Sequence, residues 1–473
     1  CREVRDKGHQ IVWRTDRLGM PLTETVTGAD LRTPEEVRDA ILLCGLTARS
    51  TGRVRTGIGA SRQDVNVSVR GGSRVEIKGV PRAGHAVRLV HNEAVRQVNL
   101  LALREEMHRR GMDSPGAIRA HPLDVSDVFA DTDLDFLRRA RQGGGRVFAV
   151  RVEGAAGLAQ HPTQPDTAFL DELSGRIRVI ACLDEPPIVL SAAALPEFPD
   201  RHRTLDRLRK RVRPGERDDL FLVFGPEEDC RTAAEEIRLR FADASVGIPK
   251  ETRQALTGGF TTFERILPGP DRMYPDTDSP PTRVTAERVA ALKARLRPAP
   301  WDRIERYVRW RVPEETCRWL IRRGGAEIVD EVVARTGADG LVAAIEIGQR
   351  GRALRRAGVP VERLQAAEWV AIFDLYAAGR IPREAIPAVA ARVARDGGAA
   401  EAAAAAEGIA LEPRESWREE AGRILEGCPE TAAVRGDKRL RCLVGRAVAM
   451  LRGRAPAREV ADYVRGRLEE VAR

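Results

Sequence analysis

Residues 57–69 read Gly-Ile-Gly-Ala-Ser-Arg-Gln-Asp-Val-Asn-Val-Ser-Val, and residues 74–79 read Arg-Val-Glu-Ile-Lys-Gly. In residues 64–69 and again in residues 74–78, apolar residues alternate with polar ones, which is the period of a half-buried strand. The intervening Gly71-Gly72 pair indicates a turn. The two segments therefore predict a β-hairpin with polar groups on one face.

Five polar side chains accompany this hairpin. Asp64 and Asn66 share a face of the first strand, and Glu76 and Lys78 share a face of the second, because alternate residues of a strand point the same way. Arg62 precedes the first strand. Mixed charges converging on a sheet face favour a nucleotide and hard-metal site. An exposed, salt-bridged face is the competing interpretation.

The segments before and after the hairpin indicate an α/β region over residues 1–112. Thr33-Pro-Glu-Glu36 combines an N-cap residue, a first-turn proline and two acids, and predicts a helix that runs to about Ser50. The β-branched residues of 21–27 predict a strand. An amphipathic pattern predicts a long helix over residues 91–110.

Residues 113–245 change in character and predict a self-contained α+β module. We expect helices at 134–141 and 231–244, and strands at 146–152, 177–183 and 220–224. Residues 246–283 show little regular pattern. Within them Arg272, Tyr274, Asp276 and Asp278 lie close together, which indicates an ordered functional loop. From about residue 284 to the end the chain predicts only helices, the last three at 415–425, 439–452 and 457–471.

Composition excludes several classes of protein. A hydrophobic fraction of 42% in 473 residues supports real cores and excludes general disorder. No apolar run approaches the length of about 18 residues that a membrane span needs. The seven cysteines form no CxxC pair and the seven histidines form no metal-binding cluster, which favours reduced thiols in the cytoplasm. No Walker, GxGxxG or GxSxG motif marks a catalytic site.

Positive charge is concentrated at the end of the chain. The 79 basic residues include only six Lys, and Arg binds phosphate in two-pronged contacts. The net charge is +9, and residues 435–473 contribute 11 Arg or Lys against 5 Asp or Glu. A basic terminal domain predicts nucleic-acid binding. A solvated helix face is the alternative interpretation.

Taken together, these strings resemble the GatB/GatE family of tRNA-dependent amidotransferases. The hairpin, Asp16-Arg-Leu-Gly-Met-Pro-Leu-Thr-Glu24, Asp30-Leu-Arg-Thr-Pro34, Gly247-Ile-Pro-Lys-Glu-Thr-Arg253 and Arg272-Met-Tyr-Pro-Asp-Thr-Asp278 occur in family order. The inserted module resembles the GAD domain, which is typical of the archaeal GatE branch and absent from GatB. Gly379-Arg-Ile-Pro-Arg383 and Leu443-Val-Gly-Arg-Ala-Val-Ala-Met-Leu-Arg-Gly453 resemble the family's helical and YqeY-like tail.

This resemblance implies a multidomain α+β fold with a mixed-sheet cradle. The expected parts are a kinase-like cradle at 1–112, a GAD-like insertion at 113–245, a cradle return at 246–283, a helical domain at 284–370 and a YqeY-like tRNA-binding tail at 371–473. The start at Cys1 reads like family interior, so we expect the N-terminal part of the cradle, with a metal-binding His and Glu, to precede it.

The implied activity is ATP-dependent amidation of Glu carried on misacylated tRNA(Gln), with Mg²⁺ and with ammonia from a GatD-like asparaginase or glutaminase subunit. The resemblance further implies a hetero-oligomer with a homodimeric core and no membrane. Two alternatives stay open: a noncatalytic tRNA-binding relative or truncated fragment, and a piece of an aspartyl-tRNA synthetase, which only the insertion favours.

Site residues follow from the same resemblance. It implies that Glu24 binds the metal, that the catalytic residues are Arg62, Asp64, Asn66 and Lys78, and that the cofactor-binding residues are Arg62, Glu76 and Lys78. Arg272, Tyr274, Asp276 and Asp278 are assigned only to the cradle. The chain departs from the family pattern at Ala29-Asp30, where a proline usually precedes the Asp, and at Ala181–Pro186, where relatives carry His-Ser-Asp-Glu-Leu-Pro.

Overall fold

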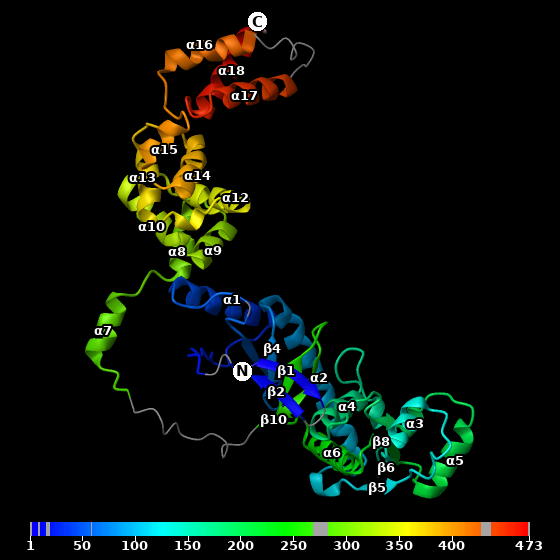
Figure 1. The fold of residues 1–473 in the computed structure, drawn as a ribbon. Helices are drawn as coiled ribbons and strands as arrows, with labels where there is room; N and C mark the ends of the chain where they lie inside the picture. Colours follow the sequence, from blue (N-terminus) through cyan, green and yellow to red (C-terminus); the bar gives the residue numbers. More distant parts are fainter. Residues whose placement is uncertain are drawn as a thin grey trace. The chain divides into compact units, whose positions relative to one another are not determined.

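The fold is that of a computed structural model, which describes residues 2–471 apart from 8–9, 16–18, 58, 268–281 and 427–436. The chain divides into two compact units (Figure 1). The first comprises residues 1–43 and 56–282, and the second comprises residues 44–55 and 283–473. The predicted loop residues Arg272, Tyr274, Asp276 and Asp278 lie outside the described residues.

The first unit contains a four-stranded mixed sheet with the order β10-β9-β4-β3. The predicted hairpin is confirmed: β3 (Gln63–Val67) pairs antiparallel with β4 (Val75–Val80). On the other side β4 pairs parallel with β9 (Glu251–Ala255), which pairs antiparallel with β10 (Thr261–Ile266). A separate hairpin joins β1 (Arg2–Lys7) and β2 (Gln10–Arg14).

Two helices pack on the apolar face of this sheet. Val65, Val67 and Ile77 are buried against α2 (Ala83–Arg109) and against the start of α1 (Pro34–Ser50). The predicted start of α1 is confirmed by a capping box, in which the Glu36 amide donates to Thr33 Oγ1 at 3.2 Å and the Thr33 amide to Glu36 Oε2 at 3.0 Å. Helix α2 begins earlier than the predicted residue 91.

The segment after α2 forms a second sheet, antiparallel throughout, with the order β5-β6-β8-β7. Helices α4 and α6 cover one face of it, together with part of α2, and α3 and α5 cover the other face (Figure 1). The core on the first face includes Val75, Leu100 and Phe241, so hydrophobic packing continues across the expected boundary at residue 112. The elements are β5 (Ala120–Asp124), α3 (Asp135–Gln142), β6 (Arg146–Val152), α4 (Phe169–Ile180), β7 (Leu190–Ser191), α5 (Arg201–Val212), β8 (Asp219–Gly225) and α6 (Glu227–Val246).

Three predictions of secondary structure are wrong. Residues 21–27 form no strand and are exposed, with Leu22 at 82%, because a β-branched segment needs a neighbouring strand for its backbone hydrogen bonds. The predicted strand at 177–183 begins inside α4, whose buried Phe169, Leu173 and Ile177 follow a helical period. Residues 246–283, which were expected to have little regular structure, contain β9 and β10.

The described part of the second unit is helical, as predicted, and has two hydrophobic cores. The larger core gathers α8 to α15, and the smaller core gathers α16, α17 and α18. Within the described residues, no helix is both long and apolar enough to cross a membrane. The elements are α7 (Ala286–Ala294), α8 (Pro300–Arg309), α9 (Glu314–Arg323), α10 (Gly325–Thr336), α11 (Gly340–Ala344), a π-helix (Ile345–Arg350), α12 (Gly351–Arg356), α13 (Ala366–Ala377), α14 (Ile386–Asp396), α15 (Ala400–Ala406), α16 (Arg414–Glu426), α17 (Asp437–Met450) and α18 (Ala457–Val471).

Candidate functional site

The side of the first sheet opposite α2 carries the polar residues of the hairpin, and we call it the polar face. Strand pairing places Asn66 opposite Glu76 and places Glu76 beside Thr252 of β9. Lys78 Nζ lies 3.6 Å from Glu76 Oε1, and Thr252 Oγ1 donates to Glu76 Oε2 at 3.5 Å. Glu76 is thus the centre of the face, with a cation, a hydroxyl and an amide around it.

The polar face is open enough to meet a ligand. The Glu76 and Lys78 side chains retain 20% and 25% of their exposure, while Asp64 and Asn66 are exposed. Val65, Val67 and Ile77 lie on the opposite face and are buried. A half-buried carboxylate and ammonium pair with open amide and carboxylate neighbours can position phosphate and hydroxyl groups.

The other two predicted site residues lie differently. Arg62 is exposed and stands just before β3, adjacent in sequence to the polar face. Glu24 is exposed in a stretch that forms neither helix nor strand, and no described contact joins it to the sheet. The structure thus brings Asn66, Glu76 and Lys78 together and leaves the role of Glu24 a prediction.

A complete metal site is not formed by the described residues, because they contain no group of three His, Cys, Asp or Glu side chains able to hold an ion. Glu76 and Asp64 are the carboxylates of the polar face. Mg²⁺ in nucleotide sites is commonly held by one or two carboxylates together with substrate phosphates. The polar face therefore offers oxygen ligands of the kind that Mg²⁺ prefers, but too few of them to hold the ion alone.

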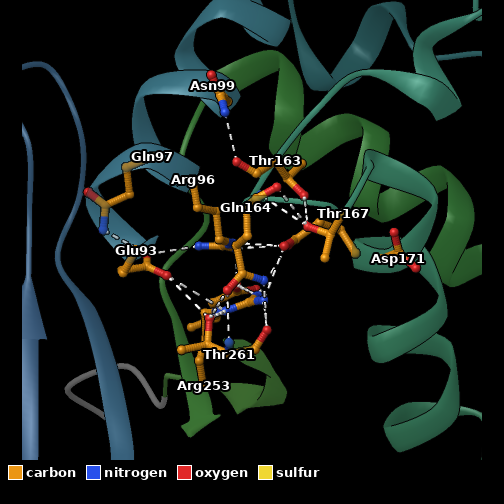
Figure 2. Close-up of polar contacts among 12 residues, drawn as sticks. Glu93, Arg96, Gln97, Asn99, Thr163, Gln164, Thr167, Asp171, Arg253 and Thr261 are labelled. Carbon is orange, nitrogen blue, oxygen red and sulfur yellow. Dashed lines mark hydrogen bonds and ion pairs between the residues drawn. The ribbon is translucent and has the colours of Figure 1, made fainter. Parts of the chain in front are cut away.

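Directly beneath the sheet lies a buried cluster of three glutamates and three arginines, which we call the charged core. Figure 2 shows Glu93 and Arg96 of α2 converging with Arg253 of β9. Every member has a side chain no more than 2% exposed. The members are Glu93, Arg96, Glu172, Arg240, Glu251 and Arg253, so their formal charges cancel.

Glu172 of α4 is the hub of the charged core. Arg96 Nε and Nη2 donate to its two carboxylate oxygens at 2.8 Å each, and Arg253 donates to the same two oxygens at 3.1 Å each. Arg240 Nη2 of α6 adds a bond of 3.3 Å. Two bidentate guanidinium contacts give a carboxylate a strongly fixed geometry.

The ionisation of the charged core follows from its pairing. Burial alone would raise the pKa of Glu172, but Arg253 and Arg96 hold that pKa well below its usual range. Burial opposes the charge on Arg96, yet Glu172, Glu93 and Glu251 hold its pKa well above the ordinary value. For Arg240 burial wins and its pKa is lowered. The charges that surround Glu172 and Arg96 therefore keep both of them ionised.

The charged core sets the position of the polar face through β9. Glu251 and Arg253 point into the core, and Thr252 between them contacts Glu76 on the other side of the sheet. Arg253 Nη1 donates to Glu251 Oε1 at 2.6 Å, and Arg253 Nε donates to Thr261 Oγ1 at 2.8 Å. The two faces of β9 thus connect the cluster to the candidate site.

Amides of α2 and of a nearby loop complete the framework around the sheet. Gln97 Nε2 donates to the Val67 carbonyl at 3.1 Å, and the Val69 amide donates to Gln97 Oε1 at 3.1 Å. Gln164 forms two bonds of 2.9 and 2.8 Å with the backbone of Thr261 (Figure 2). These contacts fix the end of β3 and the start of β10.

Sequence reasoning misses the charged core. Its one visible signal is the placement of Glu93, Arg96 and Gln97 one turn apart among Leu89, Leu100 and other buried apolar residues of α2. The string 247–253 resembles the family but lies in a segment that shows little regular pattern in sequence. Its Glu251 and Arg253 instead belong to a buried strand.

Comparison with known proteins agrees with this architecture. The sequence-family model described as the GatB/GatE catalytic domain matches residues 1–290. This range includes the two four-stranded sheets and the charged core. This match covers more than half of the chain, and the protein belongs to the GatB/GatE family.

Several curated relatives resemble the chain, and each is named as the E subunit of glutamyl-tRNA(Gln) amidotransferase. The protein of Thermococcus gammatolerans is 32% identical over all of this chain and 74% of its own length. That of Methanocaldococcus jannaschii is 29% identical over the same shares. The Methanopyrus kandleri protein is 35% identical over 83% of this chain, which spans 61% of that relative.

Proposed function

We propose that the chain is the catalytic subunit of a glutamyl-tRNA(Gln) amidotransferase. The observation that carries this proposal is the similarity of the whole chain to proteins named as the E subunit of that enzyme. The family match over the two sheets supports it. The noncatalytic alternative is not favoured by these comparisons, nor is an aspartyl-tRNA synthetase fragment.

The chemistry asked of such a protein has two steps. The γ-carboxylate of Glu on tRNA(Gln) attacks the γ-phosphorus of ATP, releasing ADP and giving an acyl phosphate. Ammonia then attacks the acyl carbon, phosphate leaves, and Gln-tRNA(Gln) is formed. The first step is needed because a carboxylate is a poor electrophile, and it depends on positioning and electrostatics.

The polar face supplies groups suited to the first step. Lys78 and Arg62 are placed to attract phosphate oxygens, and Glu76 holds Lys78 in place at 3.6 Å. Asp64 and Asn66 are exposed on the neighbouring strand and can orient the substrate carboxylate or hydroxyl groups. When bound, Mg²⁺ would neutralise charge on the phosphates, and Glu24 is proposed as one of its ligands.

We extend the proposal to the domains of the chain, the source of ammonia and the assembly. The segment that carries β5 to α6 is proposed as a GAD-like insertion and the C-terminal helices as a YqeY-like tail. Ammonia is proposed to come from a GatD-like amidase subunit in a cytoplasmic hetero-oligomer with a homodimeric core. The absence of a nucleophile motif in the sequence is consistent with ammonia being made elsewhere.

The test is conversion of Glu-tRNA(Gln) by the full polypeptide that carries this chain, mixed with a partner amidase. Gln-tRNA(Gln) should appear only when ATP, Mg²⁺ and an amide donor are all present. If purified complex binds Glu-tRNA(Gln) but forms no Gln-tRNA(Gln) under these conditions, the noncatalytic alternative is correct instead.

A further inference from the structure

Helix α5, in the segment that carries the second sheet, is strongly basic. Residues 201–213 contain seven Arg or Lys and one Asp, a net charge of +6 over 13 residues. Residues 435–473 carry the same net charge over 39 residues. Residues 201–213 therefore carry the same net charge as the end of the chain in one third of the length.

The apolar stripe of α5 fixes which of its residues face solvent. Leu208 is fully buried, and Leu205 and Val212 pack against the same core as α3, β6 and β8 (Figure 1). These positions repeat at three and four residues along one side of the helix. The opposite side, with Arg203, Arg207 and Lys210, is exposed.

Counter-charges neutralise only part of this exposed side. Arg201 pairs with Glu197, and Arg211 Nε lies 4.0 Å from Asp127 Oδ2. Arg207 Nη2 donates to the Asp127 carbonyl at 2.9 Å. In contrast, the side chains of three cations of α5 have no hydrogen bond or ion pair with any residue that the structure describes: Arg203, Arg209 and Lys210.

Other exposed helices of the protein manage their arginines differently. On α6, Arg231 pairs with Glu227 at 2.6 Å and Arg238 pairs with Glu235 at 2.6 Å. On α2, Arg109 pairs with Glu106. These are acid–base pairs within one turn, the usual solution for a solvated helix face. The single acid of α5, Asp206, forms no ion pair with Arg203, Arg209 or Lys210 in the described structure, so the field of these cations reaches into solvent and attracts anions.

The spacing of the charges favours a polyanion over a single small anion. Arg203 and Lys210 are seven residues apart, which is about 10 Å along a helix axis. Arginine matches phosphate oxygens in bidentate fashion, and an unpaired row of cations can contact successive phosphates of a nucleic acid backbone.

We propose that the exposed side of α5, through Arg203 and Lys210 with Arg209 at its flank, binds the phosphate backbone of the tRNA substrate. This contact is separate from any made by the tail, and it rests on the proposed function for the identity of the RNA. It assigns to the inserted segment a part in substrate binding, through charge and without base recognition.

The test measures how tRNA affinity depends on salt. The variant carries R203Q, R209Q and K210Q, which keep helix-forming side chains and remove three charges. Each phosphate contact contributes about 0.7–0.9 to the slope of log affinity against log salt, so the slope should become shallower by about two to three. Raising salt from about 50 to 200 mM should then cost the wild type roughly 20–40-fold more affinity than it costs the variant.

The matched control is R109Q/R231Q/R238Q, which removes the same charge from arginines that have nearby acids. Its salt slope should stay at the wild-type value. In turnover assays with the partner amidase, the α5 variant should raise the KM for Glu-tRNA and leave kcat unchanged. A purely structural role of Arg209 and Lys210 at the helix end would lower α5 stability without changing the slope.

Three results would contradict the proposed contact between α5 and tRNA. If the wild type binds tRNA and forms Gln-tRNA but the two variants have equal salt slopes, the α5 contact is wrong and the proposed function stands. A variant that keeps tRNA affinity but loses a protein partner would assign the face to that partner instead. Absence of salt-dependent tRNA binding in the wild type would remove the proposed function together with this inference.

Discussion

At the scale of single residues, Lys78 is the described cation closest to the centre of the polar face. Its ammonium lies 3.6 Å from Glu76, and a quarter of its side chain remains exposed. This combination keeps the charge oriented and still able to contact a ligand. The hairpin pattern predicted the position of Lys78 correctly, because period-two alternation determines which residues share a face.

The first prediction concerns Lys78→Ala. If Lys78 positions transferred phosphate, its loss should lower the rate of Gln-tRNA(Gln) formation by about 100-fold, the size expected for one electrostatic stabiliser. Lys293→Ala is the control, since Lys293 is an exposed lysine of α7 in the other unit. A Lys78→Ala enzyme with the wild-type rate would contradict the role.

The second prediction concerns Glu24→Gln. As a metal ligand, Glu24 should set the Mg²⁺ concentration needed for half-maximal activity, and that concentration should rise at least about 10-fold in the variant. Glu35→Gln, which changes another exposed acid, on α1, should leave it unchanged. An unaltered Mg²⁺ titration in Glu24→Gln would show that the metal assignment is wrong.

At the scale of elements, β9 is the connection between the charged core and the polar face. It was missed because hydrophobic periodicity identifies a strand only when its buried side chains are apolar. In β9 the buried residues are Glu251, Thr252 and Arg253, and the burial of the charged Glu251 and Arg253 depends on partners in α2 and α4. Those partners lie more than 70 residues away in sequence, so no local pattern could reveal the strand.

The third prediction tests the charged core with Glu172→Gln. Removing the hub charge leaves Arg96 and Arg253 buried without their shared carboxylate, which should cost about 3–5 kcal/mol of local stability. Hydrogen exchange at α4 and β9 reports this opening free energy. Glu235→Gln, which breaks an exposed pair with Arg238, should cost less than about 1 kcal/mol.

The Glu172→Gln variant also tests how the stability of the charged core depends on pH. The pKa of Glu172 is held well below the ordinary value of 4.5, so its stabilising contribution is complete above that pH and is lost as pH falls below it. Protection of α4 and β9 should therefore decrease with acidification below about pH 4.5 in the wild type, and less steeply in Glu172→Gln. Equal protection in both proteins at pH 7 would contradict the account of the charged core.

The fourth prediction concerns the packing of α11 in the second unit. A Cβ on Gly340 would lie 2.3 Å from Cδ2 of the Trp310 ring, which itself stacks on Tyr307. Gly340→Ala should cost about 1–3 kcal/mol, seen as a lower urea midpoint of tryptophan fluorescence. Gly445→Ala has open space in α17 and should stabilise its helix by about 0.5–1 kcal/mol. Destabilisation by both changes to the same extent would exclude the clash.

At the scale of the whole molecule, the sequence predicted the order of secondary-structure elements along the chain better than the packing between them. The hairpin and the helical second unit were predicted correctly from local pattern. The shared core of α2, α4 and α6 was not, because the continuity of packing between distant segments leaves no trace in periodicity. For the site, the polar face was predicted, and its support by the charged core was visible only in three dimensions.

If this chain phosphorylates the side-chain carboxylate of Glu carried on tRNA(Gln), as we propose, the acyl phosphate can be trapped chemically. The most direct measurement mixes the full polypeptide with Glu-tRNA(Gln), ATP, Mg²⁺ and hydroxylamine, without an amide donor. An acyl phosphate formed at the γ-carboxylate would be trapped as a γ-hydroxamate, with one ADP released for each. We predict ATP-dependent hydroxamate on Glu-tRNA(Gln). Tight binding of Glu-tRNA(Gln) with neither hydroxamate nor ADP would contradict it.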